Sequence, residues 1–468
     1  MPKQDGASDI LAALTSGDDD GRRVVIQGAT VITMDAAVDD QLAGDVFING
    51  RLIERVEPHV PGRELPDDVV VVPAHGCIVI PGFHDTHRHC WQTQLRRMFA
   101  AVDLEQYVDV AHARLAPEYR VEDIYVATLL AGLGAIEGGV TSLLDFAHNT
   151  RTPEYSDAAF RAHEDSGIRA VVAVAPPLSG EWNHHWPADM SRVAESSRTS
   201  RVSSAYGVFG TSDLGGDGIA LTPENVAHAR DLGLPIVTDA TFGPSASANI
   251  ERLGERGLLG PDITLIHCTA LSSAAWDYIE NYGVQVALTT TSDAEIGIFD
   301  ANPPITESLR RGIRPGLSVD VECSLSGDMF AQIRATYTIQ RMQAFARGQL
   351  AEAGPEPMSP RRALEMATID GAAVNRVAHL SGSITPGKRA DLVVVSTDGA
   401  STMPMNNAIS SVTLGSDSAS VRDVFVDGTI RKWGGELVGV DLAHLRKRVV
   451  ESRDYLLEAS GYSPNPLR

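Results

Sequence analysis

The chain has 468 residues, of which 43% are hydrophobic and 21% charged, so it can bury a large core and is not extensively disordered. Its 39 basic and 61 acidic residues give a formal net charge of −22, which argues against nucleic-acid and anionic-membrane partners. There is no signal-peptide pattern, no apolar run near the roughly 20 residues of a membrane span, and no Cys-x-x-Cys motif, so we expect a cytoplasmic protein.

The first part of the chain changes from polar to β-rich. Residues 1–22 are polar and end in three aspartates, which predicts a mobile tail with at most one helical turn. Residues 23–79 contain the β-branched runs "RVVIQGATV", "DVFINGRLIERV" and "VVVVP", separated by Gly, Asp and Asn. This pattern is typical of short antiparallel strands and predicts a compact β unit.

From residue 80 to 383, apolar strands alternate with longer helical stretches. One strand precedes His87, and seven more are expected within residues 139–149, 168–177, 202–210, 234–243, 263–272, 284–293 and 316–323. Eight strand–helix units predict an α/β chain with a (β/α)₈ barrel of the TIM type. A doubly wound open sheet is the competing fold, but no Gly-x-Gly-x-x-Gly follows an early strand.

The last part of the chain returns to short strands. "SPRRALEMATIDGAAV" reads as a helix with Ser359 as its N-cap and Pro360 at its first position. Residues 384–440 then resemble residues 23–79 in pattern, so both segments are expected to form one small flanking β-sandwich subdomain. Residues 441–468 are predicted to be an amphipathic helix and a tail.

Several metal-capable side chains stand where predicted strands end, which is the face that carries the active site in such barrels. Since alternate strand residues face the same side, His87 and His89 would present two imidazoles together. The other polar residues at strand ends are Asp145, His148, Asp239, His267, Asp320 and Glu322.

The motifs "PGFHDTHRH", "LIHCTALS", "SVDVECSLSGDMF" and "GSITPGKRADLVVV" resemble those of the amidohydrolase superfamily, in particular the cytosine deaminase and triazine hydrolase branch. The resemblance implies hydrolysis of a non-peptide carbon–nitrogen or carbon–halogen bond in a small heterocyclic or amidine-like molecule by metal-activated water. It implies that His87, His89, a histidine of the fifth strand and Asp320 hold the ion. His267 would orient the water or the substrate, and Asp320 would also accept a proton from the water.

The chain departs from this pattern at the fifth strand. Asp239 stands where the resemblance places the metal-binding histidine, and Phe242 stands where it places a proton-donating glutamate. One interpretation is that Asp239 still ligates one divalent ion, zinc first, with iron or manganese as alternatives. A second is that the metal is lost and Asp239, His267 and Asp320 act as acids and bases in a lyase, isomerase or decarboxylase. A third is a catalytically silent binding barrel.

Other residues are candidates for the remaining roles. Glu322 could replace the missing proton donor, and the alternative is that it caps the next helix or pairs with an arginine. Gln92, His148, Trp182 and His185 are candidates for substrate binding. The alternatives are helix capping for Gln92, a structural role for His148, and a surface loop at a subunit contact for the other two. The expected partners are a small-molecule substrate and, at the family level, further copies of the chain in a homodimer or homotetramer.

Overall fold

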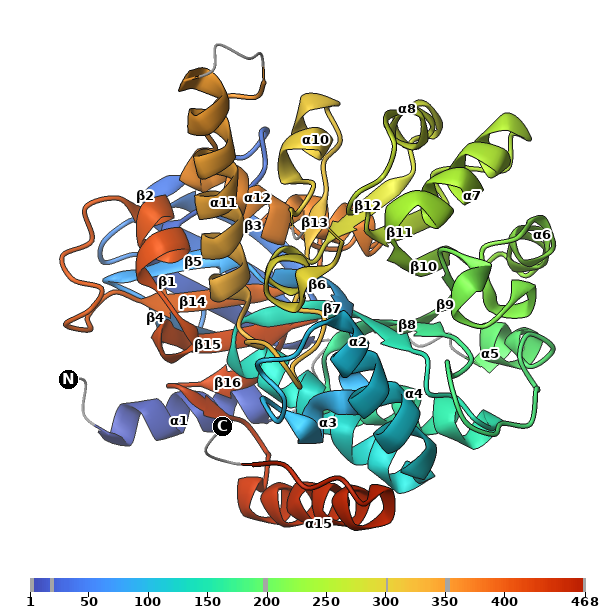
Figure 1. The fold of residues 1–468 in the computed structure, drawn as a ribbon. Coiled ribbons are helices and arrows are strands. Elements are labelled where there is room, and N and C mark those ends of the chain that lie inside the picture. The colour runs from blue at the N-terminus through green and yellow to red at the C-terminus, as the bar shows by residue number, and fades with distance from the viewer. Residues whose placement is uncertain (1–3, 17–20, 197–200, 300–301, 350–353, 466–468) are drawn as a thin grey trace.

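The computed structural model describes residues 4–16, 21–196, 201–299, 302–349 and 354–465. A barrel of strands surrounded by helices forms the larger part, and a second sheet lies at its side (Figure 1). Within the described part of the chain, no helix is both long and apolar enough to cross a membrane.

Eight parallel strands form the barrel, and each pairs with the next in chain order. The seam between the first and the last strand is bridged by two backbone hydrogen bonds: the amide of His89 donates to the carbonyl of Asp320 at 3.1 Å, and the amide of Asp320 donates to the carbonyl of His87 at 3.0 Å. The predicted (β/α)₈ fold is confirmed. The strands are β6 (Phe83–Arg88), β7 (Val140–Ala147), β8 (Arg169–Val174), β9 (Val202–Phe209), β10 (Ile236–Thr241), β11 (Ile263–His267), β12 (Gln285–Leu288) and β13 (Gly316–Leu317).

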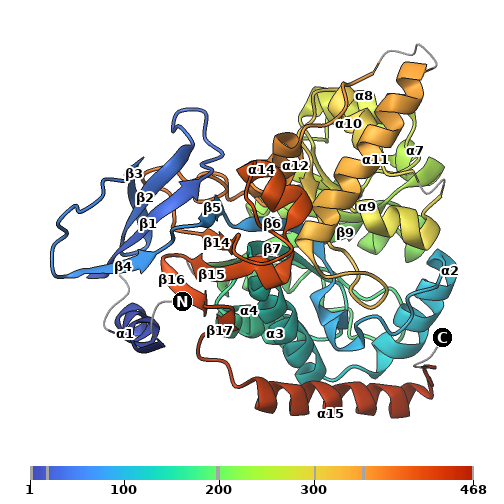
Figure 2. The same cartoon turned by 90° about the vertical axis from the view of Figure 1, so that its left-hand side faces the viewer.

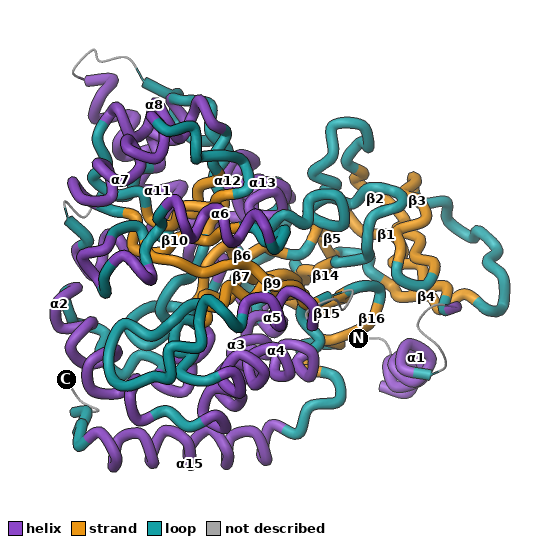
Figure 3. The backbone as a smooth tube through the Cα atoms, turned by 90° about the vertical axis from the view of Figure 1, so that its right-hand side faces the viewer, coloured by secondary structure: helices purple, strands orange, loops and turns teal. Residues whose placement is uncertain are grey.

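Helices cover the outside of the barrel (Figure 3). Ser359 caps α12 as predicted, because its hydroxyl accepts the amide proton of Arg362 at 3.2 Å, and Pro360 is the first helical residue. The helices between the strands and after them are α2 (Leu104–Tyr107), α3 (Val121–Glu137), α4 (Pro153–Ser166), α5 (Met190–Ser196), α6 (Pro223–Asp231), α7 (Gly243–Glu255), α8 (Ser273–Tyr282), α9 (Thr290–Ser292), α10 (Ile305–Arg310), α11 (Met329–Gln349), α12 (Pro360–Ala367), α13 (Ile369–Val374) and α14 (Ala408–Ser410).

The two ends of the chain form a separate nine-stranded sheet beside the barrel (Figure 2). The two segments meet where β5 pairs with β14 in antiparallel register. Alternate side chains of these strands form a second apolar core that is distinct from the core of the barrel. The strands are β1 (Arg23–Val31), β2 (Gln41–Asn49), β3 (Leu52–Pro58), β4 (Val69–Pro73), β5 (Cys77–Pro81), β14 (Leu392–Ser396), β15 (Val421–Val426), β16 (Thr429–Trp433) and β17 (Glu436–Leu437).

The N-terminal segment differs from its prediction. Residues 4–15 form the helix α1 (Gln4–Thr15), not a tail with one helical turn. Leu14 is buried, and Ile10 and Leu11 pack against the core of the flanking sheet. These three residues form an apolar stripe that is stabilised by tertiary packing, which the polar composition of the segment concealed. The three aspartates at residues 18–20 lie outside the described residues.

The C-terminal segment matches its prediction. The helix α15 (Leu442–Ser460) runs along the outside of the barrel beside α3, as Figure 2 shows. Leu445 and Leu456 are its buried apolar residues, so the helix presents one apolar face to the barrel.

A buried ion-pair network joins the barrel to the flanking sheet. Arg169, at the start of β8, pairs with Asp391 at 3.0 Å and with Asp427 at 3.4 Å. All three residues are buried, so each charge depends on its partners for the interactions that it would otherwise make with water.

Candidate active site

Two histidines stand where the first barrel strand, β6, ends. His87 and His89 are both buried, and their ring centroids are 4.6 Å apart. Because alternate strand residues face the same side, both imidazoles point into the barrel. The Nδ1 of His89 lies 3.4 Å from the carbonyl oxygen of Phe146, which leaves its Nε2 free to bind a ligand.

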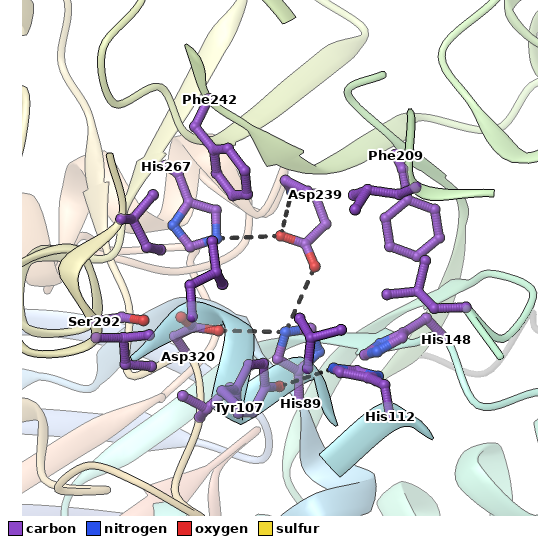
Figure 4. Close-up of a pocket in the computed structure, with 18 residues that line it drawn as sticks. His89, Tyr107, His112, His148, Phe209, Asp239, Phe242, His267, Ser292 and Asp320 are labelled. Atoms are coloured by element: carbon purple, nitrogen blue, oxygen red, sulfur yellow. Dashed lines mark hydrogen bonds and ion pairs between the residues drawn. The ribbon is translucent and has the colours of Figure 1, made fainter. Parts of the chain in front are cut away.

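Two carboxylates, those of Asp239 and Asp320, face these imidazoles, and Figure 4 shows both of them beside His89. Oδ1 of Asp320 lies 3.1 Å from Nε2 of His87 and 3.3 Å from Nε2 of His89. Asp239 places Oδ1 3.8 Å from Nε2 of His87, and Oδ2 3.5 Å from Nε2 of His89. Four ligands arranged tetrahedrally at normal zinc distances would be separated by about 3.4 Å. The ligand atoms of His87, His89 and Asp320 lie close enough together to hold one divalent ion, and those of His87, Asp239 and His267 form a second such set that shares His87.

The hydrogen bonding of these atoms also indicates a metal site. Nε2 of His87 and Oδ1 of Asp320 are buried, and neither finds a well-directed hydrogen-bond partner among the described residues. Buried polar atoms are almost always satisfied, and a cation between the two would satisfy both. His87, His89 and Asp320 are thus able to hold a metal, and Asp239 is able to hold one together with His87 and His267.

The charges of this cluster are strongly coupled. Burial opposes ionisation of the two aspartates, but the surrounding histidines hold the pKa of Asp239 and the pKa of Asp320 well below the ordinary range. Both are carboxylates at neutral pH. The cluster therefore offers two negative charges, which match the charge of one divalent cation.

His267 joins the cluster from the end of β11. Its Nε2 lies 3.3 Å from Asp239, and its Nδ1 lies 2.9 Å from Asp293 and 2.6 Å from the hydroxyl of Thr289. Burial opposes protonation, yet hydrogen bonds to Asp239 and Asp293 raise the pKa of His267 well above its ordinary value. Asp293 was not identified from the sequence, although it ends the stretch predicted as the seventh strand.

The backbone turns sharply where these side chains are presented. Ala240, His267 and Asp320 have φ values of 51°, 72° and 66°. Non-glycine residues rarely adopt this left-handed conformation, and such strain concentrates at functional sites. These residues lie at or within three positions of strand ends, so the rigid barrel fixes the positions of the side chains.

A cavity with a volume of about 110 Å³ lies over the cluster. The polar residues that line it, apart from the cluster itself, are Tyr107, His112, His148 and Ser292. Burial and the neighbouring His89 lower the pKa of His112 to about 3, so this imidazole is neutral. Most of the remaining wall is aliphatic and consists of Leu104, Val108, Leu178, Leu214, Ile296 and Ile298.

Phe242 forms part of the same wall, at the position where the resemblance expects a glutamate. Its ring centroid lies 5.5 Å from that of His267 and 5.4 Å from that of Phe299. The position predicted to lack a proton donor is therefore an apolar surface of the pocket.

The structure does not support the predicted catalytic role of Glu322. Its buried carboxylate accepts hydrogen bonds from Arg88 and Arg96, and it does not line the cavity. Burial opposes ionisation, but the two guanidinium groups lower the pKa of Glu322, so it holds no proton to donate. The alternative, pairing with an arginine, is what the structure shows.

The candidate substrate-binding residues divide into two groups. His148 lines the cavity, and its contact with substrate stays a prediction. Gln92 lies behind the wall, where its amide donates to the hydroxyl of Tyr107 at 2.8 Å. Trp182 and His185 do not line the cavity; the ring of Trp182 packs on a neighbouring loop residue, His184, with a centroid separation of 4.2 Å.

Direct substrate contacts by Gln92, Trp182 and His185 are therefore not supported. Instead, Leu178 reaches the cavity from the loop after β8, and Tyr107 and His112 reach it from the segment after β6. Neither Tyr107 nor His112 was identified from the sequence. The only signal was their place in a helical stretch after the His-x-His motif.

Comparison with known proteins agrees with the resemblance found in the sequence. A family model described as the amidohydrolase family matches residues 78–431. A 5′-deoxyadenosine deaminase from Methanosarcina acetivorans is 25% identical over 422 residues, which cover 87% of this chain and 92% of that one. A 5-methylthioadenosine/S-adenosylhomocysteine deaminase from Desulforamulus reducens is 24% identical over 426 residues, which cover 87% and 93%.

Solved structures show the same fold. An adenosine deaminase from Xanthomonas campestris with bound zinc superposes with a TM-score of 0.78 at 20% identity, covering 94% of this chain and 99% of that one. An atrazine chlorohydrolase from Arthrobacter aurescens complexed with zinc has a TM-score of 0.76 at 19% identity, covering 92% and 100%.

Proposed function

This chain belongs to the amidohydrolase family, and from that premise we propose that it hydrolyses a carbon–nitrogen or carbon–halogen bond of a small heterocyclic molecule. The observation that carries the proposal is the buried set of His87, His89 and Asp320, whose ligand atoms lie close enough together to hold one ion, with Asp239 facing the same two imidazoles. The relatives support it, because their names describe a deaminase or a chlorohydrolase acting on a ring.

His87, His89 and Asp320, whose ligand atoms lie close together, would hold the metal, and Asp239, 3.8 Å from Nε2 of His87, would complete the ligand set. Zinc is the first candidate, since two of the similar structures contain it. The two carboxylates make the ligand set harder than one dominated by imidazole, so iron and manganese are the alternatives. When bound, such an ion lowers the pKa of a water molecule from 15.7 to about 7.

The chain's own residues supply the remaining functions. Asp320 is ionised and faces the centre of the cluster, so it can accept a proton from the attacking water. Asp293 and Thr289 fix the imidazole of His267, which can then orient the water or the substrate. The aliphatic wall excludes bulk water from this region and strengthens each of these interactions.

One observation favours a second candidate. Phe242 provides no proton for a leaving group, which is unusual for a hydrolase that expels an amine. A metal-independent lyase, isomerase or decarboxylase would need only acids and bases, and Asp239, His267 and Asp320 are placed to act as these groups.

Elemental analysis separates the two candidates. The protein would be purified without chelator or metal-affinity resin, and its metal content would be compared with that of His87→Ala. We expect about one equivalent of zinc, iron or manganese in the wild type, and its loss in the variant. His444→Ala, an exposed position on α15, is the matched control and should retain the metal. Wild-type protein that carries no metal would contradict the hydrolase and favour the second candidate.

A further inference from the structure

The candidate metal ligand Asp320 lies beyond the regular part of its strand. β13 consists of Gly316–Leu317 alone, and its side of the sheet ends where the amide of Ser318 donates to the carbonyl of Leu288 at 3.0 Å. Asp320 follows with a φ of 66°, and two backbone hydrogen bonds join it to β6 across the seam of the barrel. The position of its carboxylate therefore depends on what holds this irregular segment in place.

Arg88 stands between the two histidines of β6 and is the residue paired with Asp320 across the seam. Because alternate strand residues face opposite sides, its side chain points away from the metal cluster. Arg88 is only 1% exposed, and two carboxylates meet its charge: Nε donates to Asp85 at 2.7 Å, and a terminal nitrogen donates to Glu322. These pairs replace the water that a buried guanidinium has lost.

The two carboxylates hold the chain on both sides of Asp320. Asp85 also accepts the amide proton of Val319, the residue before Asp320, at 3.1 Å. Glu322 belongs to the same segment and lies two residues after Asp320. Arg88 therefore links β6 to the chain before and after the ligand, in addition to the two backbone hydrogen bonds.

A second arginine completes this network from the segment after His89. Nε of Arg96 donates to one carboxylate oxygen of Glu322, and another nitrogen of Arg96 lies 3.4 Å from the other oxygen. The amide of Arg97 also donates to the carbonyl of Glu322 at 2.9 Å. The seam network, with two positive and two negative charges, consists of Asp85, Arg88, Arg96 and Glu322.

Two glycines make room for the seam network. A Cβ atom at Gly327 would lie 2.5 Å from a carboxylate oxygen of Glu322, and one at Gly134 would lie 2.5 Å from a terminal nitrogen of Arg96. Neither glycine has a positive φ, so conformational freedom does not explain them. Gly134 also lies inside α3, where glycine is less favourable than any residue but proline. Space for the two charged side chains is what these glycines provide.

We propose that the seam network positions Asp320 against His87 and His89, so that the affinity of the cluster for a metal ion depends on it. The inference rests on the proposed function, because it assumes that these residues bind a metal. Among the described residues that line the cavity, none belongs to the seam network. Its members are therefore positioning residues that act through the ligands.

The test compares zinc binding and local backbone opening in the full-length protein. Glu322→Gln keeps the shape of the side chain but removes the charge that faces both arginines. We expect zinc affinity, measured by competition with a chromogenic chelator, to fall about 10- to 100-fold. In the metal-free protein, amide hydrogen exchange of residues 318–323, followed by mass spectrometry, should become about tenfold faster or more.

A matched control separates positioning from general stability. Asp391→Asn breaks the other buried ion-pair network, which Arg169 joins at the start of β8 and so at the opposite end of the strand from the cluster. It should destabilise the protein, yet the folded variant should bind zinc like the wild type and leave exchange of residues 318–323 unchanged. An equal loss of zinc affinity in Asp391→Asn would show that Glu322→Gln acts through stability, and would overturn the proposal.

A second variant disturbs the network without changing any charge. Gly134→Ala favours the helix but would displace Arg96, so it should weaken zinc binding. Gly348→Ala, in α11 with open space around it, is the matched control and should bind zinc like the wild type. This pair decides the question if Glu322→Gln does not fold.

The remaining outcomes are distinguishable from failure of the proposed function. Zinc affinity and hydrogen exchange in Glu322→Gln equal to those of the wild type would overturn the role of the seam network. Wild-type protein that binds no zinc would contradict the metal-dependent hydrolase and the effect on metal affinity. The exchange of residues 318–323 would then decide by itself whether the network holds Asp320 in place.

Discussion

The carboxylate of Asp239 lies 3.3 Å from Nε2 of His267 and 3.5 Å from Nε2 of His89, where the amidohydrolase pattern would place a third metal-binding imidazole. The substitution exchanges a neutral ligand for an anionic one and brings the number of carboxylates in the cluster to two. Because each anionic ligand reduces the positive charge that the bound water experiences, this site should acidify water less than a site with three histidines.

Replacing Asp239 with asparagine should cause the protein to lose its bound metal. The variant keeps the shape of the side chain but removes the negative charge and the stronger ligand atom. Loss of a residue that only supports a metal ligand weakens metal binding about 10- to 100-fold, so loss of the ligand itself should exceed this range. Elemental analysis after dialysis measures the effect. Asp231→Asn, an exposed position at the end of α6, is the control, and full metal content in Asp239→Asn would show that Asp239 is not a ligand.

Replacing Asp293 with asparagine should lower the pKa of His267. The Asp293 carboxylate stabilises the protonated imidazole at a distance of 2.9 Å, so its removal disfavours the charged form. Any limb of the pH–rate profile that reports His267 should therefore move to lower pH, and turnover should fall about 10- to 100-fold while metal content is retained. An unchanged profile with normal turnover would show that Asp293 has only a structural role.

Local sequence patterns predicted the barrel because several of its strands are continuous apolar runs followed by polar turns. β8 (Arg169–Val174) is an example: its residues are buried on both faces, so hydrophobicity alone marks it as a strand. The helix α1 was missed for the opposite reason. Its stripe of Ile10, Leu11 and Leu14 is short, and it forms a stable helix only against the flanking sheet, which comes from distant parts of the chain.

The site was predictable where function depends on strand ends and unpredictable where it depends on contacts between distant segments. His87 and His89 stand at a strand end and Asp320 lies just beyond one, so it could be predicted from their positions that they lie together. The pairing of Glu322 with Arg96 joins residues that are 226 positions apart, and nothing local to Glu322 distinguishes an ion pair from a proton donor. Tyr107 reaches the cavity because the segment after β6 folds back over the barrel, which its sequence does not indicate.

Replacing Asp391 with asparagine should destabilise the protein at neutral pH. Asp391 and Arg169 are both buried, and removal of one partner of such a pair costs about 3–5 kcal/mol in the free energy of unfolding. Burial opposes ionisation of Asp391, but Arg169 lowers its pKa below the unfolded value of about 3.9. Its contribution is therefore present above that pH and is lost as the pH falls through the lower pKa of the folded state.

Equilibrium denaturation in urea, at neutral pH and below about pH 3, measures this effect. The difference between the wild type and Asp391→Asn should shrink at the lower pH. Asp68→Asn removes an exposed carboxylate that pairs with Arg23 at 3.3 Å, so it should change the free energy of unfolding by less than about 1 kcal/mol. A difference that does not depend on pH would mean that Asp391 contributes through packing and not through its charge.

Replacing Phe242 with glutamate should introduce the missing proton donor. The new carboxyl group would lie in an apolar wall beside His267 and near the ionised Asp239, so burial and the like charge should raise its pKa toward neutrality. A general acid contributes about 10²- to 10⁴-fold where the leaving group needs a proton. An amine needs that proton and a halide does not, because chloride is a very weak base. Two substrates with the same ring, one with an amino and one with a chloro substituent, test this. The variant should turn over the amino compound faster than the wild type does, with no such increase for the chloro compound.

The matched control is Phe242→Gln, which has nearly the same shape as the glutamate variant but no acidic proton. If the gain comes from proton donation, it should be absent in Phe242→Gln and should decline as the pH rises through the raised pKa of the new glutamate. Equal gains in both variants would instead indicate that the smaller side chains enlarge the cavity. No gain in either variant, with metal content intact, would mean that proton supply does not limit the reaction, and that the wild-type enzyme expels a group that leaves without a proton.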